Sequence, residues 1–293
     1  MSYKKAYLKP KKEVSIKRFH PWIFSGAINN IDGVPEEGEI VEVYDSAKNF
    51  LALGHCQIGS IAIRIISFKN ETIDVAFWEG RFRAAYDLRK KLNLIDNSKN
   101  TIYRLVHGEG DNLPGLIIDV YGNTAVMQAH SPGMHFARTD LAQALKNVLG
   151  EQLDNIYYKS ETTLPYKADL NAENGYLIGG DNVASVSIEN GLKFRVDWEK
   201  GQKTGFFVDQ RENRMLLERY AKDKKVLNMF CYTGGFSVYA MNGGAKEVHS
   251  VDSSGKAITL TDENVALNFP EQTNHTSYTE DAFKFLAGID DSY

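Results

Sequence analysis

The chain has 293 residues, of which 43% are hydrophobic and 25% are charged, and its net charge at pH 7 is −4. This composition is typical of a globular protein with a buried core, and the charge excludes a general attraction to nucleic acid. The apolar runs are far shorter than a membrane span, and Cys56 and Cys231 lack the spacing of a disulfide framework or metal site. We therefore expect a cytoplasmic protein with no structural disulfide, no metal and no membrane partner.

The N-terminal segment is locally basic although the whole chain is acidic. Residues 1–20 contain seven lysine and arginine residues and one acid, Glu13, and several aromatic residues follow. Cations contact phosphates while rings stack on bases, so the segment is predicted to bind RNA. The alternative interpretation is a solvated terminus in front of a core strand. The residues expected to contact RNA are Lys9, Lys11, Lys12, Arg18, His20 and Trp22.

The first two thirds of the chain alternate between β-like and helical patterns. Residues 37–68 contain short apolar runs separated by glycine and charged turns, which predicts a small β-barrel. Residues 75–95 carry apolar side chains at helical spacing, which predicts an amphipathic helix. A hairpin turning at Gly122 and a second amphipathic helix over residues 137–150, ended by Gly150, are expected next.

The last third predicts a hairpin, a helix and then a regular alternation of strands and helices. Asn190-Gly191 between two alternating runs is typical of a type I′ hairpin turn. Asp209 with Glu212 has the spacing of a capping box and predicts a helix start. From Val226 onward strands and helices alternate, which favours a parallel, doubly wound sheet and an α/β fold.

Three features of this alternation predict an adenosine-binding site. Gly234 and Gly235 form a tight turn after the first strand, where a ligand can approach the backbone. Asp252 ends the second strand, where its carboxylate can accept hydrogen bonds from ribose hydroxyls. Asp281 follows the third strand, within reach of an adenine amino group. The turn lacks the G-x-G-x-x-G pattern that a dinucleotide requires, so S-adenosylmethionine is the expected cofactor.

Several motifs resemble one enzyme family. The segments GQKTGFFVDQRENR, VLNMFCYTGGFSVYA, VDSS and EDAFKFL are similar to those of bacterial class I, S-adenosylmethionine-dependent methyltransferases that form 5-methylcytosine in 23S ribosomal RNA. KRFHPWIFSGAI with EIVEVYD and FLALGHC resembles their PUA domain, an RNA-binding β-barrel. The resemblance implies a PUA-like domain over residues 1–74, a central α/β domain over 75–185 and part of a Rossmann-like methyltransferase domain over 186–293.

The resemblance also implies roles for individual residues. Ribosomal RNA is the implied substrate, and a homodimer is the implied assembly. Residues matching the segment beside the cofactor and target are Gln202, Lys203, Asp209 and Arg211. Residues matching the cofactor motifs are Asn228, Phe230, Tyr232, Thr233, Gly234, Gly235, Asp252, Ser253, Asp281 and Ala282.

No catalytic residue is assigned within the chain. Methylation at C5 requires a cysteine thiolate that adds to the pyrimidine ring, and in the resembled family this cysteine is expected beyond Tyr293. Cys231 and Cys56 are instead interpreted as small core residues. The chain is therefore expected to be truncated, and to bind cofactor without transferring a methyl group. Two alternatives remain: a guanine-N2 ribosomal RNA methyltransferase, and a non-catalytic RNA-binding protein on the same scaffold.

Overall fold

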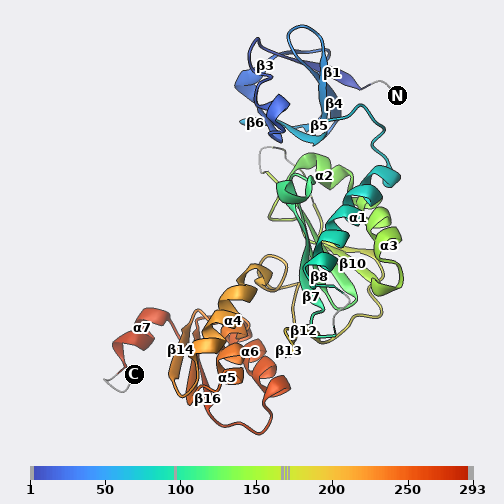
Figure 1. Ribbon diagram of the computed structural model, residues 1–293. Coiled ribbons are helices and arrows are strands. Elements are labelled where there is room, and N and C mark those ends of the chain that lie inside the picture. The colour runs from blue at the N-terminus through green and yellow to red at the C-terminus, as the bar shows by residue number, and fades with distance from the viewer. Residues whose placement is uncertain (1–2, 96–97, 166–167, 169, 171, 290–293) are drawn as a thin grey trace. The chain divides into compact units, whose positions relative to one another are not determined.

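The computed structural model describes residues 3–95, 98–165, 168, 170 and 172–289. These residues form two compact units, which are described one at a time (Figure 1). Unit 1 comprises residues 1–93 and 104–183, and unit 2 comprises residues 94–103 and 184–293. The domain boundaries at residues 74 and 185 stay predictions.

Unit 1 begins with a six-stranded sheet in the order β2-β6-β5-β4-β1-β3, in which β1 and β4 run parallel. The predicted β structure is therefore confirmed, as a curled half-barrel. Alternation explains its core, because Val41 and Val43 of β4 point inward while Glu42 between them does not. The strands are β1 (Lys4–Leu8), β2 (Trp22–Phe24), β3 (Ile28–Ile31), β4 (Ile40–Tyr44), β5 (Phe50–Cys56) and β6 (Ile61–Ser67), with short 3-10 helices η1 (Ile16–Arg18) and η2 (Ser25–Ala27).

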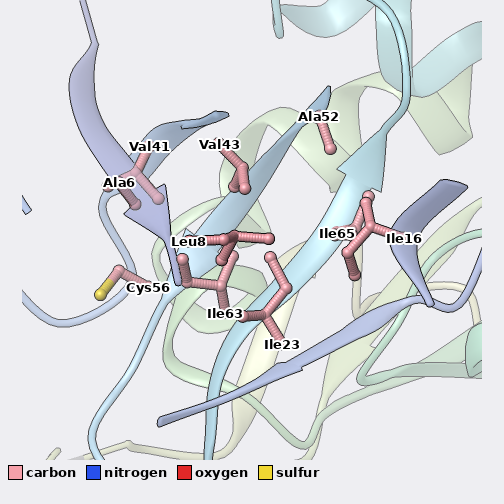
Figure 2. Packing of buried hydrophobic residues seen from close by; sticks show 10 residues of the cluster. All are labelled: Ala6, Leu8, Ile16, Ile23, Val41, Val43, Ala52, Cys56, Ile63 and Ile65. Carbon is pink, nitrogen blue, oxygen red and sulfur yellow. The ribbon is translucent and has the colours of Figure 1, made fainter. Parts of the chain in front are cut away.

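Figure 2 shows how apolar side chains of these strands and of η1 pack together in one buried cluster. The core residues drawn there are Ala6, Leu8, Ile16, Ile23, Val41, Val43, Ala52, Cys56, Ile63 and Ile65. Cys56 is one of these buried residues, which confirms its interpretation as a small core side chain.

The second part of unit 1 is a five-stranded sheet in the order β11-β10-β9-β8-β7, with α1 and α3 packed on each other (Figure 1). The predicted hairpin at Gly122 joins β8 and β9, and Gly150 ends α3 with a positive φ of 58°. The elements are α1 (Val75–Lys91), β7 (Ile102–His107), η3 (Gly108–Asp111), β8 (Leu116–Tyr121), β9 (Thr124–Ala129), α2 (Pro132–Phe136), α3 (Arg138–Leu149), η4 (Gly150–Gln152), β10 (Asn155–Tyr158) and β11 (Gly175–Ile178).

Unit 2 contains a hairpin and a parallel three-stranded sheet in the order β14-β15-β16. Both Asn190 and Gly191 have positive φ, at 51° and 85°, which confirms the predicted hairpin turn. The parallel sheet with its helices confirms the predicted alternation. The elements are β12 (Ser187–Glu189), β13 (Leu192–Phe194), η6 (Val208–Gln210), α4 (Arg211–Tyr220), β14 (Lys225–Met229), α5 (Gly235–Asn242), β15 (Glu247–Asp252), α6 (Gly255–Asn268), β16 (His275–Thr279) and α7 (Ala282–Ala287).

A buried carboxylate, Glu189, joins the hairpin to two helices of unit 2. Glu189 is fully buried and accepts two hydrogen bonds of 2.8 Å from the guanidinium of Arg214. Arg211 donates to the same carboxylate at 3.2 Å, and the hydroxyl of Tyr239 donates to it at 3.0 Å. Arg211 and Arg214 belong to α4 and Tyr239 to α5, so one anion fixes both helices against the hairpin.

The predicted capping box is wrong. Asp209 lies inside the 3-10 helix η6, and the residue that precedes α4 is Gln210, whose side chain makes no capping hydrogen bond. The 3-10 turn already directs the chain into the helix, so no Asp209 cap forms. Arg211, the first residue of α4, is only 7% exposed, so it does not lie on a solvated helix face.

The buried ring of His55 generates a prediction on pH dependence. It packs against Gly133, where an added Cβ would lie 2.1 Å from the ring, and burial lowers its pKa to about 4. The folded pKa is below the ordinary value, so the stability from neutral His55 is present above pH 6.5 and is lost as pH falls toward 4. The free energy of unfolding falls between pH 7 and 4 in both proteins. We expect the fall to be about 3 kcal/mol smaller in the His55→Phe protein than in the parent.

Calorimetric unfolding of both proteins across this pH range measures the difference. Protonation of surface carboxylates is common to parent and variant, so it cancels. An equal loss in the two proteins contradicts the assignment of this pH dependence to His55.

Candidate cofactor and RNA sites

The predicted glycine turn lies between β14 and α5 and has an unusual backbone. Phe230, Tyr232 and Gly234 all have positive φ, at 57°, 50° and 73°. At Gly234 a side chain is excluded sterically as well, because an added Cβ would lie 2.6 Å from Cγ2 of Thr261. The turn therefore brings backbone close to its neighbours at the carboxyl end of a parallel strand, where ligands of such sheets bind.

Tyr232 is the best anchored residue of the turn. Its backbone amide donates to Oδ2 of Asp252 at 3.0 Å, and its carbonyl accepts from the hydroxyl of Thr261 at 3.0 Å. Its own hydroxyl donates to the carbonyl of Gly205 at 3.1 Å and accepts from the amide of Gln202 at 2.9 Å. These four bonds offset the cost of a left-handed conformation at a non-glycine residue.

Asp252 stands at the end of β15, directly beside the turn. One carboxylate oxygen accepts from Tyr232 and the other from the amide of Ser254 at 2.9 Å. A carboxylate has about four acceptor sites, so capacity for the two hydroxyls of a ribose is left. Ser253 is exposed next to it. The carboxylate is thus both a brace of the turn and an available acceptor.

Asp281 lies after β16, in the position that the sequence predicts. Its Oδ1 accepts from the amides of Phe283 at 3.0 Å and Lys284 at 3.1 Å, which makes it the N-cap of α7. Ala282 is buried beneath this cap. The helix start explains part of the sequence pattern, and the contact with adenine stays a prediction.

Two residues of α6 complete the turn and were missed from the sequence. Thr261 holds the carbonyl of Tyr232, and Asn264 donates to the carbonyl of Thr233 at 2.9 Å. Both residues are fully buried. In the sequence they resemble ordinary polar residues of an amphipathic helix, so no local signal identifies them.

The segment at residues 202–211 divides into two parts. Gln202 and Lys203 are close to the turn: Gln202 bonds to Tyr232, and the ammonium of Lys203 lies over the ring of Phe207, which packs on Tyr232. Arg211 is instead bound to Glu189 and to the carbonyl of Ile102. The described contacts therefore bring the first part of the segment to the turn and give Arg211 a role in packing.

The basic residues near the N-terminus gather around the exposed ring of Phe19, an aromatic residue of the same segment that is not among the residues predicted to contact RNA. Lys11, Lys12, Arg18 and His20 line a hollow of about 700 Å³ together with Phe19. Phe19 is 72% exposed, and its ring is braced edge-on by Phe68 at 5.1 Å. A positive φ of 63° at the end of η1 turns this residue outward, and a positive φ in a phenylalanine has no local sequence signal.

Trp22 and Lys9 differ from the prediction in their surroundings. The indole nitrogen of Trp22 donates to Glu109 at 2.8 Å, and Arg64 lies over the indole ring, 5.7 Å from its centre. Lys9 donates to the carbonyl of Gly26 at 3.0 Å and does not line the hollow at Phe19. Trp22 is therefore already engaged on its edge and on one face.

The thiols of the chain are shielded. Cys231 is buried beside Thr261, and burial raises its pKa to about 11. Burial also raises the pKa of Cys56 to about 11. Within the described residues, no three His, Cys, Asp or Glu side chains are grouped so that they could hold a metal ion. No helix in that same part of the chain is long and apolar enough to cross a membrane.

Two family comparisons fit this geometry. Residues 6–68 match the PUA-like domain family, and residues 163–288 match the S-adenosylmethionine-dependent methyltransferase family. A protein from Streptococcus mutans described as a SAM-dependent methyltransferase superposes with a TM-score of 0.81 at 26% identity, covering 98% of this chain and 73% of that one. A methyltransferase solved with SAH superposes with a TM-score of 0.82, also at 26% identity, covering 98% and 72%. The fold and turn thus define a methyltransferase whose cofactor is S-adenosyl-L-methionine.

Sequence similarity to curated proteins identifies the family within this class of methyltransferases. The ribosomal RNA large subunit methyltransferase I of Tolumonas auensis is 42% identical over 284 residues, which is 96% of this chain and 70% of the relative. The enzyme of the same name from Aeromonas hydrophila is 40% identical with the same coverage of both chains. The chain belongs to the ribosomal RNA large subunit methyltransferase I family.

The geometry of Asp252 predicts a large effect on cofactor binding. Asp252→Ala removes the acceptor predicted for the ribose and the brace of Tyr232. A hydrogen bond to a charged group contributes about 1.5–3 kcal/mol, so affinity for S-adenosylhomocysteine should fall at least about tenfold. Titration calorimetry measures it, with Glu271→Ala, an exposed acid in the turn after α6, as the matched control. Equal affinity of the Asp252→Ala protein and the parent removes Asp252 from the site.

Proposed function

We propose that this chain serves the transfer of a methyl group from S-adenosylmethionine to C5 of a cytosine in large-subunit ribosomal RNA. The observation that carries the proposal is the glycine turn braced by Asp252, in a chain 42% identical to a ribosomal RNA large subunit methyltransferase I. In this proposal Asp252 holds the ribose and the backbone of Gly234 and Gly235 faces the cofactor. Asp281 lies on the adenine side.

C5 methylation needs a thiolate, and the two thiols in this chain are poorly suited to supply it. The reaction forms a bond between sulfur and C6 of the pyrimidine, which makes C5 nucleophilic toward the methyl group. Cys231 and Cys56 are buried with pKa values raised to about 11, so both are protonated at neutral pH. We propose that the nucleophile is neither of them, and that Cys231 serves only as a small side chain under the turn.

The identity of the methylated nucleoside tests the proposal. Large-subunit ribosomal RNA from cells lacking this modification is incubated with the protein and methyl-labelled cofactor, and the digested nucleosides are separated by mass. Because neither thiol of this chain is proposed as the nucleophile, the expected result for these 293 residues is cofactor binding with no labelled 5-methylcytidine. Labelled N2-methylguanosine supports the alternative chemistry, and RNA binding by a chain that does not bind the cofactor supports a non-catalytic role. Labelled 5-methylcytidine formed by this chain alone overturns the assignment of the two thiols.

Burial of the thiols gives a second, independent prediction. At pH 7.5 less than about one thiol in a thousand is ionised at a pKa near 11, so neither cysteine should react with iodoacetamide in the folded protein. The Cys231→Ala protein should keep the cofactor affinity of the parent. Rapid alkylation of Cys231, or methyl transfer by the parent chain that Cys231→Ala abolishes, overturns this assignment. Alkylation in denaturant is the positive control.

We further propose that RNA binds at the hollow around Phe19. Lys11, Lys12 and Arg18 supply cations for phosphates, and the exposed ring of Phe19 supplies a surface for one base. His20 also lines the hollow. Because Trp22 is engaged by Glu109 and Arg64, Phe19 is the better stacking residue.

Salt-dependent binding of single-stranded ribosomal RNA fragments tests this surface. Phe19→Ala should weaken binding about tenfold with an unchanged salt slope, because stacking contributes about 1–3 kcal/mol per base. Replacing Lys11, Lys12 and Arg18 by alanine should flatten the slope by about 0.7 for each lost phosphate contact. Val34→Ala, which truncates another highly exposed apolar side chain of the same unit, is the control. If Phe19→Ala binds as the parent does, the ring is not in the RNA site.

A further inference from the structure

A chain of side-chain hydrogen bonds crosses the sheet of unit 2 beneath the glycine turn. Nδ2 of Asn228 donates to Oγ of Ser237 at 2.9 Å, Oγ of Ser237 lies 2.6 Å from Oγ of Ser250, and Oγ of Ser250 lies 2.8 Å from Nε2 of His275. Both serines are fully buried. The chain therefore links β14, α5, β15 and β16 through groups shielded from water.

The strand register explains why these residues meet. Asn228 and Ser250 are paired in the parallel ladder, and neighbours in register project on the same face of a sheet. His275 is two residues before Ser277, the partner of Ser250 on β16, so it lies on that face as well. Ser237, in the first turn of α5, fills the space between the first two strands.

The imidazole of His275 gives these hydrogen bonds a direction. Its Nδ1 faces the carboxylate of Asp262 at 4.0 Å, which places the proton of the neutral ring on Nδ1 and leaves Nε2 as an acceptor. The hydrogen of Ser250 therefore goes to Nε2, and the hydroxyl of Ser250 accepts from Ser237. Ser237 has no partner besides Asn228 and Ser250 among the described residues, so it is left to accept from Asn228.

This direction fixes the orientation of the Asn228 amide. With Nδ2 held by Ser237, Oδ1 points away from the helix and has no hydrogen bond among the described residues. Asn228 is half-buried and precedes the glycine turn by one residue of β14. If Asp252 at the end of β15 holds the ribose, the amino-acid end of the cofactor lies over β14, where Oδ1 can accept from its ammonium group.

We propose that His275 is a positioning residue for the cofactor: through Ser250 and Ser237 it holds the Asn228 amide with Oδ1 toward the amino-acid end of S-adenosylmethionine. This inference rests on the proposed cofactor site. His275 itself touches no reacting atom. Its role is to keep Oδ1 of Asn228, rather than Nδ2, turned toward the ligand, which favours a ligand that carries an ammonium group.

Protonation of His275 reverses the chain. Nε2 then donates to Ser250, and Ser250 donates to Ser237. The hydroxyl of Ser237 can now donate to Asn228 as well as accept from it, so the orientation of the Asn228 amide is no longer fixed. The groups facing His275 are Asp262 on α6, which favours its charged form, and His249 on β15, which disfavours it and is itself bonded to Glu247 at 3.1 Å. Burial is the largest effect and lowers the pKa of His275, so the directed form holds at neutral pH.

A matched pair of ligands separates this role from general stability. S-adenosylhomocysteine carries the amino-acid end, and 5′-methylthioadenosine has the same adenosine and thioether without it. Ser250→Ala should weaken S-adenosylhomocysteine about fivefold and leave methylthioadenosine unchanged, since only the bond to the charged end depends on the chain. Asn228→Ala should have the same selective effect, and combining it with Ser250→Ala should add nothing further.

The titrating group is tested by His275→Gln, whose amide oxygen can still accept from Ser250. The parent should lose its preference for S-adenosylhomocysteine as pH falls through the pKa of His275, whereas His275→Gln should keep it at all pH values. Ser277→Ala, a serine on the same face outside the chain, is the control and should match the parent.

Two failures are distinguishable. A parent protein that binds neither ligand overturns the proposed cofactor site itself. A parent that binds S-adenosylhomocysteine, with Ser250→Ala weakening both ligands equally or neither, overturns only the positioning role of His275.

Discussion

The buried carboxylate of Glu189 is the constraint on which unit 2 depends. Two guanidinium groups, those of Arg211 and Arg214, are desolvated around it, and Tyr239 donates to it from a second helix. A buried charge is tolerated only when it is paired and hydrogen-bonded, so these four side chains have to assemble together. Removing Glu189 would leave two buried cations without a counter-charge, at a cost of about 3–5 kcal/mol.

The position of the glycine turn follows from this cluster. Arg214 packs within 3.2 Å of the place where a Cβ of Gly235 would lie, and Tyr239 is on the helix that Gly235 begins. On the other side, Thr261 and Asn264 of α6 hold the turn by its carbonyls. The backbone of the glycine turn is therefore clamped between an ion cluster and a pair of neutral hydrogen bonds.

The parts of this arrangement that were predictable from sequence are the local ones. Asn190-Gly191 and Gly150 have backbone requirements that only a few residue types meet, and the glycine turn with Asp252 repeats a strand-end pattern. The capping box predicted at Asp209 is wrong because residue spacing does not reveal that a 3-10 turn precedes the helix.

What sequence reasoning missed is non-local or conformational. Arg211 finds its partner 22 residues away, and neither residue signals that it is buried. The exposure of the Phe19 ring depends on a left-handed backbone, and the role of Thr261 depends on a contact with a distant turn; the adjacent residues reveal neither.

The shielding of Cys56 and Cys231 has a practical consequence for spectroscopy. Maleimide reagents and thiol-directed nitroxide reagents react with thiolates. Because the native thiols of this protein stay protonated, they react little with these reagents. A single cysteine introduced at an exposed position, such as Val34 on unit 1, would be modified selectively without first removing the native pair. With a second label at exposed Tyr220 on unit 2, the distance between the two labels would report the separation of the two units.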